Sequence, residues 1–472
     1  MKQIDRHYID GAWRESIGQT EFDIENPATE QVIGTLKLGS AEDVDEAVSA
    51  ARRAFPSYSR LNTAERSELL KALAKSVAAR RDDLAQAMMQ EMGAPYWMAS
   101  TFQVDIGLGQ VDVALEVLKS FQFEEQRGRF TVRHEPIGVC GLITPWNFPI
   151  MAIMCKLVPA LATGCTVVLK PSEYSPLSAE ILASAFHDAG YAPGVFNMVF
   201  GSGEVVGEAI SGHRDITMVS ITGSTRAGIA VAKRAAETVK RVHQELGGKS
   251  PNVILPSAPL EDAVTRGVKM MMLNSGQGCS LPSRMIVPNA CMDEVKEIAR
   301  KAAEDCAVGA PEGNVYLGPV ANRNQFRKVQ DLIASGISDG ATLVVGGEGR
   351  PEGLDQGYFI RPTVFADTRP DMRIVREEIF GPVLVIQGYD DEEEALALAL
   401  DTEYGLAAYV EAGTVEEGRV FANQIPAGQI AINGATPDLA APFGGYKQSG
   451  NGREMGVFGF EAFLETKAVI VP

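Results

Sequence analysis

The sequence predicts an α/β protein in which a doubly wound parallel sheet is joined to a second α/β domain and a small β arm. Three features of the 472-residue chain support this architecture. Residues 164–245 repeat a strand, turn and helix pattern, which is typical of a parallel sheet covered by helices. A second alternation begins after Gly247 and Gly248, the expected hinge between the domains. Residues 127–139 are charged and alternating, which predicts a protruding hairpin or an exposed loop.

The N-terminal part of the first domain is expected to contain short strands and two helices. Residues 8–13 and 22–30 have strand patterns separated by turn residues. A capping box at 40–43 opens the first helix. A second, longer helix is expected from about 63 to 93, because apolar residues recur there at helical spacing.

The rest of the first domain is expected to form the parallel sheet. Its segments alternate in the order strand 166–169, helix 177–189, strand 195–199, helix 204–210, strand 216–221, helix 225–237 and strand 241–244. In such sheets a ligand binds outside the carboxyl ends of the strands. Polar loops follow those ends at 170–173, 201–207 and 222–225. We therefore expect a nucleotide along this edge.

The second domain is expected to be another α/β layered structure. Its strands are predicted at 252–255, 284–287, 342–345, 383–387 and 429–433, and its helices at 262–273, 293–307 and 392–400.

Charge and composition exclude several classes of function. The chain has 61 acidic and 43 basic residues, and its net charge of −18 repels nucleic acid and anionic lipid. The longest apolar stretch, 149–169, is interrupted by Lys156, Pro159 and Gly164, so no membrane segment is expected. The six cysteines form no CxxC pair and the five histidines no metal-ligand pattern, so we predict no metal site and a reducing, cytoplasmic setting.

Cys279 lies in a glycine-rich turn that suits a nucleophile. Gly276 and Gly278 remove side-chain bulk and permit positive φ, so the thiol can be presented beside main-chain N–H groups. A lone cysteine is most often a buried apolar residue. Here the glycines, with the polar Asn274 and Gln277, make a poor core segment, which favours the nucleophile.

Two further residues have the chemistry that such a nucleophile needs. Asn147 stands between bulky rings and two prolines, where its amide could donate to an oxyanion or simply cap a turn. Glu245 closes the last strand of the first sheet at the domain boundary. It could act as a general base, or it could be an ordinary surface carboxylate.

Other residues are candidates for nucleotide contacts. Gly223 and Ser224 follow a strand and open a helix, so they could bind a pyrophosphate or serve only as a helix cap. The glycines at 201–207 do not have the usual dinucleotide spacing and are a weak signal. Lys170 and Glu173 could bond ribose hydroxyls or form a solvated surface pair.

Seven motifs, taken in order, resemble the signature set of the NAD(P)-dependent aldehyde dehydrogenase superfamily. They are Trp-Asn-Phe-Pro at 146–149, Lys-Pro-Ser-Glu at 170–173, Thr-Gly-Ser-Thr at 222–225, Glu-Leu-Gly-Gly-Lys-Ser-Pro at 245–251, Gly-Gln-Gly-Cys at 276–279, Glu-Ile-Phe-Gly-Pro at 378–382 and Pro-Phe-Gly-Gly-Tyr-Lys at 442–447. The resemblance runs from about residue 8 to the C-terminus. Seven motifs in one order are far more specific than any one of them.

The resemblance implies a two-step reaction that oxidises an aldehyde to a carboxylic acid. Cys279 would attack the aldehyde carbon, and the Asn147 amide and the Cys279 N–H would hold the oxyanion. Hydride would pass to the nicotinamide, and water deprotonated by Glu245 would hydrolyse the thioester. Lys156 matches a family lysine near the active site and is the fourth catalytic candidate.

The resemblance also implies the cofactor contacts. The predicted set is Trp146, Lys170, Ser172, Glu173, Gly203, Gly207, Gly223, Ser224, Leu246, Glu378 and Phe380. Glu378 would hold the nicotinamide ribose and Phe380 the ring. Because Glu173 would bond ribose hydroxyls and repel a 2′-phosphate, we predict NAD over NADP, although Lys170 could accept that phosphate.

The same resemblance suggests how the chain is divided and assembled. The cofactor domain would comprise 1–118 and 140–247, the catalytic domain 248–448, and an oligomerisation arm 119–139 and 449–472. The arm would otherwise leave strand edges unpaired, so a homodimer or homotetramer is predicted.

Three alternative functions compete with this interpretation. A thiol hydrolase would pair Cys279 with His243, which faces the same side of its strand as Glu245. A non-catalytic relative is disfavoured because nucleophile, base and oxyanion donor are all present, and an acyl-CoA-forming enzyme because Glu245 is present. Ala152 and Cys155 stand where better-known family members have larger side chains, so the sequence leaves the aldehyde open.

Overall fold

The computed structural model describes residues 1–472 and confirms the predicted α/β fold class. Its first sheet has eight strands in the order β20-β12-β11-β8-β9-β10-β2-β3. The strands from β12 to β10 are parallel, and antiparallel edge strands flank them. The bounds are β2 (Arg6–Ile9), β3 (Ala12–Glu15), β8 (Val139–Ile143), β9 (Thr166–Lys170), β10 (Phe196–Met198), β11 (Met218–Thr222), β12 (Arg241–Glu245) and β20 (Gly450–Asn451).

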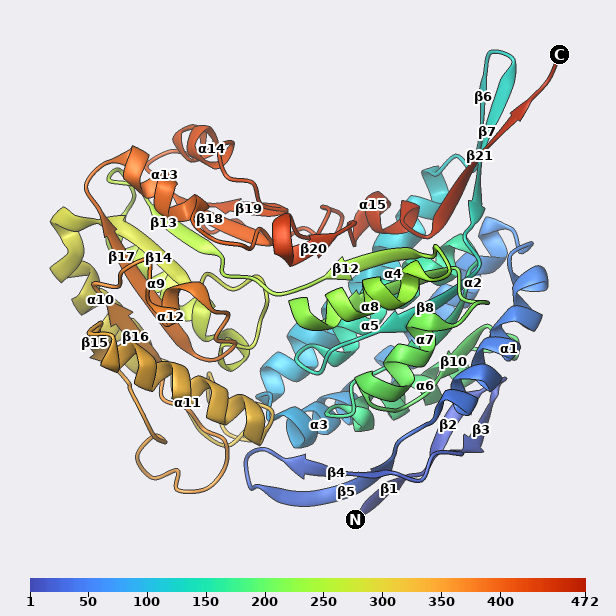
Figure 1. Cartoon of the computed structure of the whole chain (residues 1–472), viewed down its shortest axis with the longest axis horizontal. Coiled ribbons are helices and arrows are strands. Elements are labelled where there is room, and N and C mark those ends of the chain that lie inside the picture. The colour runs from blue at the N-terminus through green and yellow to red at the C-terminus, as the bar shows by residue number, and fades with distance from the viewer.

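Helices cover both faces of this sheet (Figure 1). Along β9, Val167 and Leu169 belong to one buried cluster and Val168 to another, as the alternation of a strand requires. Both faces are therefore apolar, which explains the continuous hydrophobic runs in the sequence. The helices are α1 (Ala41–Tyr58), α2 (Thr63–Ala78), α3 (Arg81–Met92), η1 (Met98–Gln103), α4 (Val104–Ser120), α5 (Pro149–Thr163), α6 (Pro176–Asp188), η2 (Gly203–Gly207), α7 (Glu208–Gly212) and α8 (Thr225–Ala236).

The structure corrects several expected elements near the N-terminus. The strand expected at 8–13 is the hairpin β2-β3, because Asp10 and Gly11 have φ of 54° and 76° and reverse the chain. The single helix expected from 63 to 93 is two helices, α2 and α3. Strand β8 and helix α4 were not predicted, since a short apolar run is ambiguous and the glycines of α4 weaken its helical pattern. A separate small sheet contains β1 (Lys2–Ile4), β5 (Gln31–Lys37) and β4 (Glu21–Asn26).

The second sheet has seven strands in the order β15-β16-β17-β14-β13-β18-β19, and only β15 is antiparallel. Strands β16 and β18 and helices α11 and α14 were not predicted. The bounds are β13 (Pro251–Ile254), α9 (Leu260–Met272), η3 (Leu273–Gly276), β14 (Arg284–Pro288), η4 (Asn289–Cys291), α10 (Met292–Glu304), α11 (Arg323–Ser338), β15 (Thr342–Val345), β16 (Thr363–Ala366), α12 (Arg373–Arg376), β17 (Val383–Tyr389), α13 (Glu392–Leu400), β18 (Ala407–Glu411), α14 (Val415–Ala422) and β19 (Gln429–Ile432).

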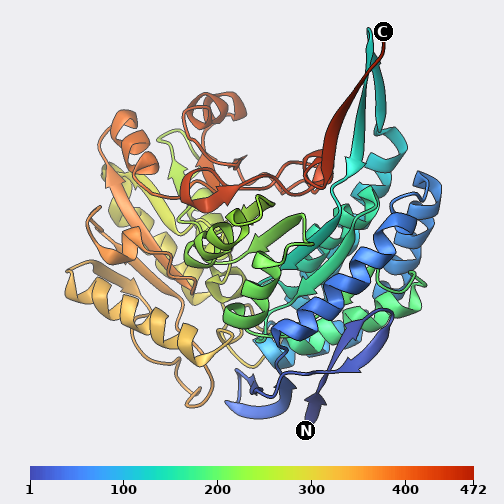
Figure 2. The ribbon, with the colours of Figure 1, turned by 45° about the vertical axis from the view of Figure 1, so that its right-hand side comes forward.

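A three-stranded antiparallel ribbon projects from the body of the molecule (Figures 1 and 2). It consists of β6 (Glu124–Arg127), β7 (Phe130–Pro136) and β21 (Leu464–Ile470). The segment expected as the second part of the arm, 449–472, is divided, because β20 pairs with β12 in the first sheet. Helix η5 (Lys447–Ser449) directly precedes β20, and α15 (Gly456–Glu461) lies between β20 and β21. No helix has the length and apolar character needed to cross a bilayer.

Candidate active site

Cys279 follows a strained turn between α9 and β14, where the two domains meet. Three successive residues, Asn274, Ser275 and Gly276, have left-handed φ of 49°, 55° and 73°. A Cβ at position 276 would lie 2.0 Å from the carbonyl oxygen of Gly381, so only glycine fits there. The turn that carries the thiol is thus pressed against the Glu-Ile-Phe-Gly-Pro segment.

Asn147 belongs to a buried hydrogen-bond network with this turn. Its Nδ2 donates to the Gln277 carbonyl at 2.9 Å, and Nδ2 of Asn274 donates to the Asn147 carbonyl at 2.9 Å. The Gln277 side chain donates to the Asn274 carbonyl at 3.0 Å and accepts from the Ala321 N–H at 2.9 Å. An amide has two N–H groups, so Asn147 can make this contact and still donate to a second acceptor.

The Cys279 thiol is only partly exposed and lies near two acidic groups. Burial, followed by the charges of Glu378 and Glu245, raises the pKa of the thiol to about 12, against the opposing N–H groups of Cys279 and Ser280. A thiol with this pKa is protonated at neutral pH. A base must therefore take its proton before it can attack a carbonyl.

Glu245 ends β12 and is almost completely buried. Neither oxygen of its carboxyl group makes a hydrogen bond. Burial, followed by the charge of Glu454, raises the pKa of Glu245 well above its ordinary value, while Lys156 and Arg453 act in the opposite direction. A carboxylate with a raised pKa and free oxygens is a stronger proton acceptor than an exposed glutamate.

Lys156 is fully buried and lies in a chain of polar contacts. Its ammonium donates to Glu454 Oε1 at 2.5 Å and to Ser220 Oγ at 3.0 Å. Ser220 Oγ lies 3.1 Å from His243 Nδ1, and His243 Nε2 lies 3.3 Å from Glu245 Oε1. Sequence analysis missed Ser220 and Glu454, because Glu454 is 298 residues from Lys156 and no local pattern joins them.

A cavity of about 590 Å³ lies along the carboxyl edge of the first sheet. It brings together five of the predicted cofactor residues, namely Lys170, Ser172, Glu173, Gly203 and Gly207. Lys170 Nζ bonds Glu173 Oε2 at 3.2 Å. No heavy atom lies within 4 Å of a Cβ built on Gly203, so the backbone there is open to a ligand.

A second cavity, of about 560 Å³, shares Arg226 with the first and contains Ser224 and Glu378. The Ser224 hydroxyl accepts from the Ala227 N–H at 3.2 Å, so the alternative role as a helix cap is present. Glu378 Oε1 accepts from the Gly248 N–H at 2.9 Å, and burial raises the pKa of Glu378. This contact joins the second cavity to the hinge.

The other predicted cofactor residues line neither cavity. The rings of Trp146 and Phe380 meet edge to face with centroids 5.6 Å apart, and Phe380 has a left-handed φ of 60°. The N–H groups of Gly223 and Leu246 each donate to a main-chain carbonyl at 3.0 Å. Those two donors are therefore already used within the chain.

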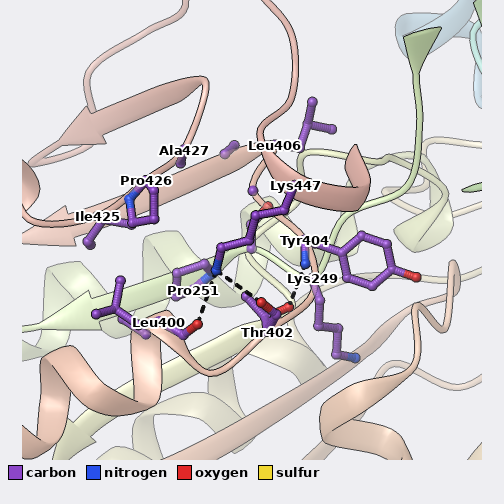
Figure 3. Close-up of a pocket in the computed structure, with 14 residues that line it drawn as sticks. Lys249, Pro251, Leu400, Thr402, Tyr404, Leu406, Ile425, Pro426, Ala427 and Lys447 are labelled. Atoms are coloured by element: carbon purple, nitrogen blue, oxygen red, sulfur yellow. Dashed lines mark hydrogen bonds between the residues drawn. The ribbon is translucent and has the colours of Figure 1, made fainter. Parts of the chain in front are cut away.

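Figure 3 shows a smaller pocket beside the domain junction, lined by Lys249 and Lys447 among others. Lys447 ends the Pro-Phe-Gly-Gly-Tyr-Lys motif and donates to the carbonyls of Leu400 at 3.2 Å and Thr402 at 3.0 Å. Lys249 is buried without a hydrogen-bond partner for its ammonium, and burial, followed by the charge of Arg284, lowers its pKa to about 7. With a volume of about 10 Å³, the pocket has room for a single water.

Comparisons with known proteins agree with this site. The sequence matches the aldehyde dehydrogenase family over residues 13–469. It is 50% identical to a 3-succinoylsemialdehyde-pyridine dehydrogenase from Pseudomonas sp., over 100% of this chain and 99% of that protein. The crystal structure of aldehyde dehydrogenase C from Pseudomonas syringae, a mutant in complex with NAD⁺ and octanal, superposes with a TM-score of 0.98 at 50% identity, over 99% of this chain and 96% of that chain. An aldehyde dehydrogenase from Bartonella henselae has a TM-score of 0.98 at 42% identity, over 100% of both chains.

The chain therefore belongs to the aldehyde dehydrogenase family. The resemblance stated from the seven motifs is confirmed, and so is the enzyme class of NAD(P)-dependent aldehyde dehydrogenase. The thiol hydrolase alternative is not favoured, because His243 contacts Ser220 and Glu245 through its two ring nitrogens.

Replacing Gly276 by alanine is expected to disable the thiol turn. The new Cβ would collide with the Gly381 carbonyl at a left-handed φ, which should lower the free energy of unfolding by about 3 kcal/mol or more. Thermal unfolding and alkylation of Cys279 by iodoacetamide measure the two effects. Gly190→Ala is the matched control, because Gly190 has φ of 79° and nothing within 4 Å of its Cβ position. Alkylation of Cys279 at the wild-type rate in Gly276→Ala would contradict this account of the turn.

Proposed function

We propose that this chain oxidises an aldehyde to a carboxylic acid with NAD, through a thiohemiacetal and a thioester on Cys279. One observation carries the proposal. Cys279, held on a strained turn, shares the domain junction with Glu245, a buried carboxyl group whose oxygens make no hydrogen bond, and the charge of Glu245 contributes to the raised pKa of the thiol. Nucleophile and base are thus linked by charge, and Glu378, which lines the second cavity, also contributes to the raised pKa of Cys279.

The donor set of the two cavities fits a dinucleotide. Lys170 and Glu173 stand at the carboxyl end of β9, and the open backbone of Gly203 leaves room for close approach. Ser224 begins α8, whose N-terminal N–H groups suit a pyrophosphate. Glu378 would hold the nicotinamide ribose. Bound NAD would supply the hydride acceptor. Two proteins similar to this chain, from Pseudomonas syringae and Bacillus cereus, have NAD⁺ in their solved structures.

The first half-reaction begins with proton removal from Cys279. The thiolate then adds to the aldehyde carbon, which leaves a negative charge on the aldehyde oxygen. The remaining N–H of the Asn147 amide and the main-chain N–H of Cys279 would bind that oxygen, and the hydrogen bonds between Asn147 and the turn support this assignment. The buried Asn274 and Gln277 hold Asn147 in place and are therefore positioning residues.

The second half-reaction hydrolyses the thioester. Glu245 would take a proton from a water molecule, which then attacks the acyl carbon and releases the acid. The raised pKa of Glu245 makes its carboxylate a stronger proton acceptor than an exposed glutamate. Lys156 and Glu454 would influence this carboxyl group through their charges.

Separate variants of Cys279 and Glu245 should affect different steps. Cys279→Ala is expected to reduce turnover by several orders of magnitude while cofactor binding persists. Glu245→Gln should release one equivalent of NADH in a burst and then stall, because glutamine keeps the size but cannot take the proton. Rapid mixing at 340 nm measures burst and steady state. Substantial turnover in Cys279→Ala, or a wild-type burst and steady-state rate in Glu245→Gln, would refute the assigned roles.

The cofactor and aldehyde preferences follow from the same site. We expect a higher kcat/KM with NAD than with NADP, because Glu173 repels a 2′-phosphate. The named relatives act on a succinoyl semialdehyde of pyridine and bind octanal, so an aldehyde panel should contain aromatic semialdehydes and medium-chain aliphatic aldehydes. The small Ala152 and Cys155 on α5 favour a wide substrate channel. A higher kcat/KM with NADP would overturn the cofactor preference.

The ribbon of β6, β7 and β21 supports a homo-oligomer, either a dimer or a tetramer. It projects from the body (Figure 2). Phe130 and Ile470 on it are exposed. We assign the cofactor domain to 1–118 and 140–247, the catalytic domain to 248–448, and the arm chiefly to the ribbon strands. All six cysteines are free, which suits a reducing, cytoplasmic setting.

Solution scattering at micromolar concentration should give a multiple of 50.6 kDa, and a monomeric mass would refute the assembly.

A further inference from the structure

His243 is a buried histidine that the reaction steps above do not use. It stands two positions before Glu245 on β12, so the two side chains point to the same face of the sheet. Its Nε2 lies 3.3 Å from Glu245 Oε1, and each of these two buried atoms is without a hydrogen-bond partner in the structure. Both side chains are almost completely buried, so no bulk water competes for these atoms.

The neighbours of His243 determine which ring nitrogen carries its hydrogen. The Lys156 ammonium can only donate, so Ser220 Oγ accepts its hydrogen bond at 3.0 Å. Apart from Lys156, the partner of Ser220 Oγ is His243 Nδ1, 3.1 Å away, so the buried hydroxyl hydrogen is satisfied when it is donated to that nitrogen. Burial, followed by the charges of Lys156 and Arg453, lowers the pKa of His243 well below its ordinary value, so the ring is neutral. A neutral ring that accepts at Nδ1 carries its hydrogen on Nε2, the atom that faces Glu245.

Two glycines of the C-terminal segment hold both side chains in narrow slots. A Cβ at Gly452 would lie 2.0 Å from His243 Cδ2, and a Cβ at Gly444 would lie 2.7 Å from Glu245 Oε1. Both glycines have positive φ, of 85° and 151°. The imidazole ring therefore has little freedom to turn away, and the carboxyl group has little freedom to leave the ring.

We propose that His243 is a positioning residue that donates its Nε2 hydrogen to the ionised Glu245 carboxylate and so holds the base ready for hydrolysis of the thioester. The inference rests on the proposed role of Glu245 as that base. The donation stabilises the charged form of the carboxylate in a site where burial disfavours it. Hydrogen bonds donated from Lys156 to Ser220 and from Ser220 to His243 leave the ring hydrogen on Nε2, the nitrogen beside Glu245.

The charged groups around Glu245 act together with this donor. Lys156 on α5 and Arg453 in the C-terminal segment favour the ionised carboxylate, and Glu454 beside Arg453 opposes it. Cys279, on the turn of the second domain, is coupled to Glu245 by charge. None of these groups makes a hydrogen bond or an ion pair with the Glu245 oxygens, whereas His243 Nε2 lies 3.3 Å from one of them.

Two amide variants of His243 separate the donor from the rest of the ring. In His243→Gln the amide nitrogen can occupy the position of Nε2 and donate to Glu245, whereas in His243→Asn the shorter amide reaches only toward Ser220. We expect His243→Asn to keep the NADH burst but to move the acid limb of the steady-state kcat to higher pH by about one unit, because the ionised carboxylate loses its donor. His243→Gln should restore most of that shift. Equal acid limbs in the two variants would overturn the proposal.

The double variant His243→Asn/Glu245→Gln shows whether His243 acts through Glu245. Its hydrolysis rate should equal that of Glu245→Gln alone, because the base is already absent. A further fall would mean that His243 acts independently and would overturn the inference. Glu245→Gln by itself tests the underlying role: if it hydrolyses the thioester at the wild-type rate, the proposed base fails, whatever the result with His243.

The tautomer can be measured without a change in activity. Nitrogen-15 spectra of histidine-labelled wild-type protein contain five histidines, and His243→Gln identifies the signal of residue 243 by its loss. We expect a neutral ring protonated at Nε2 that does not titrate between pH 6 and 9. A ring protonated at Nδ1, or an imidazolium in that range, would overturn the proposal. This measurement remains decisive if His243→Asn fails to fold.

Discussion

The site depends on the close contact of main chains where the two domains meet. The hinge after β12 brings Gly248 so near to the nucleophile that a Cβ there would lie 2.1 Å from the carbonyl oxygen of Cys279. On the other side of the turn, Gly276 is pressed against Gly381. Two segments of backbone therefore hold the turn that carries the thiol, and side chains larger than hydrogen cannot be accommodated at either contact. The position of Cys279 relative to both sheets follows from this constraint.

Burial gives the two reacting groups their acid and base properties. Removal from water disfavours a charge on Cys279 and on Glu245, so the pKa of each group is raised. The free thiol is then protonated and a weak nucleophile, and the carboxylate is a stronger proton acceptor than an exposed one. The same burial strengthens the effect of any nearby donor or charge, because little water screens it. Small changes in the surroundings of Glu245 therefore have large consequences for hydrolysis.

The C-terminal segment completes the site from outside both sheets. It crosses from the second domain to the first, where β20 pairs with β12 beside Glu245 (Figure 1). Along it, Gly444 and Gly452 shape the slots for Glu245 and His243. Glu454 reaches the Lys156 ammonium on α5. One segment thus connects the base, its neighbours and the helix that follows Asn147.

The sequence by itself determined the α/β class, the parallel sheet and the reactive setting of Cys279, because strand and helix periodicity and glycine-rich turns are local properties. The order of its motifs was enough to indicate the family. Only the tertiary structure decided that Lys156 meets Glu454, that β20 extends the first sheet, and that His243 faces Glu245 and not a thiol. The first two contacts join residues far apart in the sequence, and the third depends on the orientation of a buried ring. None of these contacts produces a periodic pattern in the sequence. The close approaches of Gly248 and Gly276 are of the same kind, since the partner that makes glycine necessary lies on another segment.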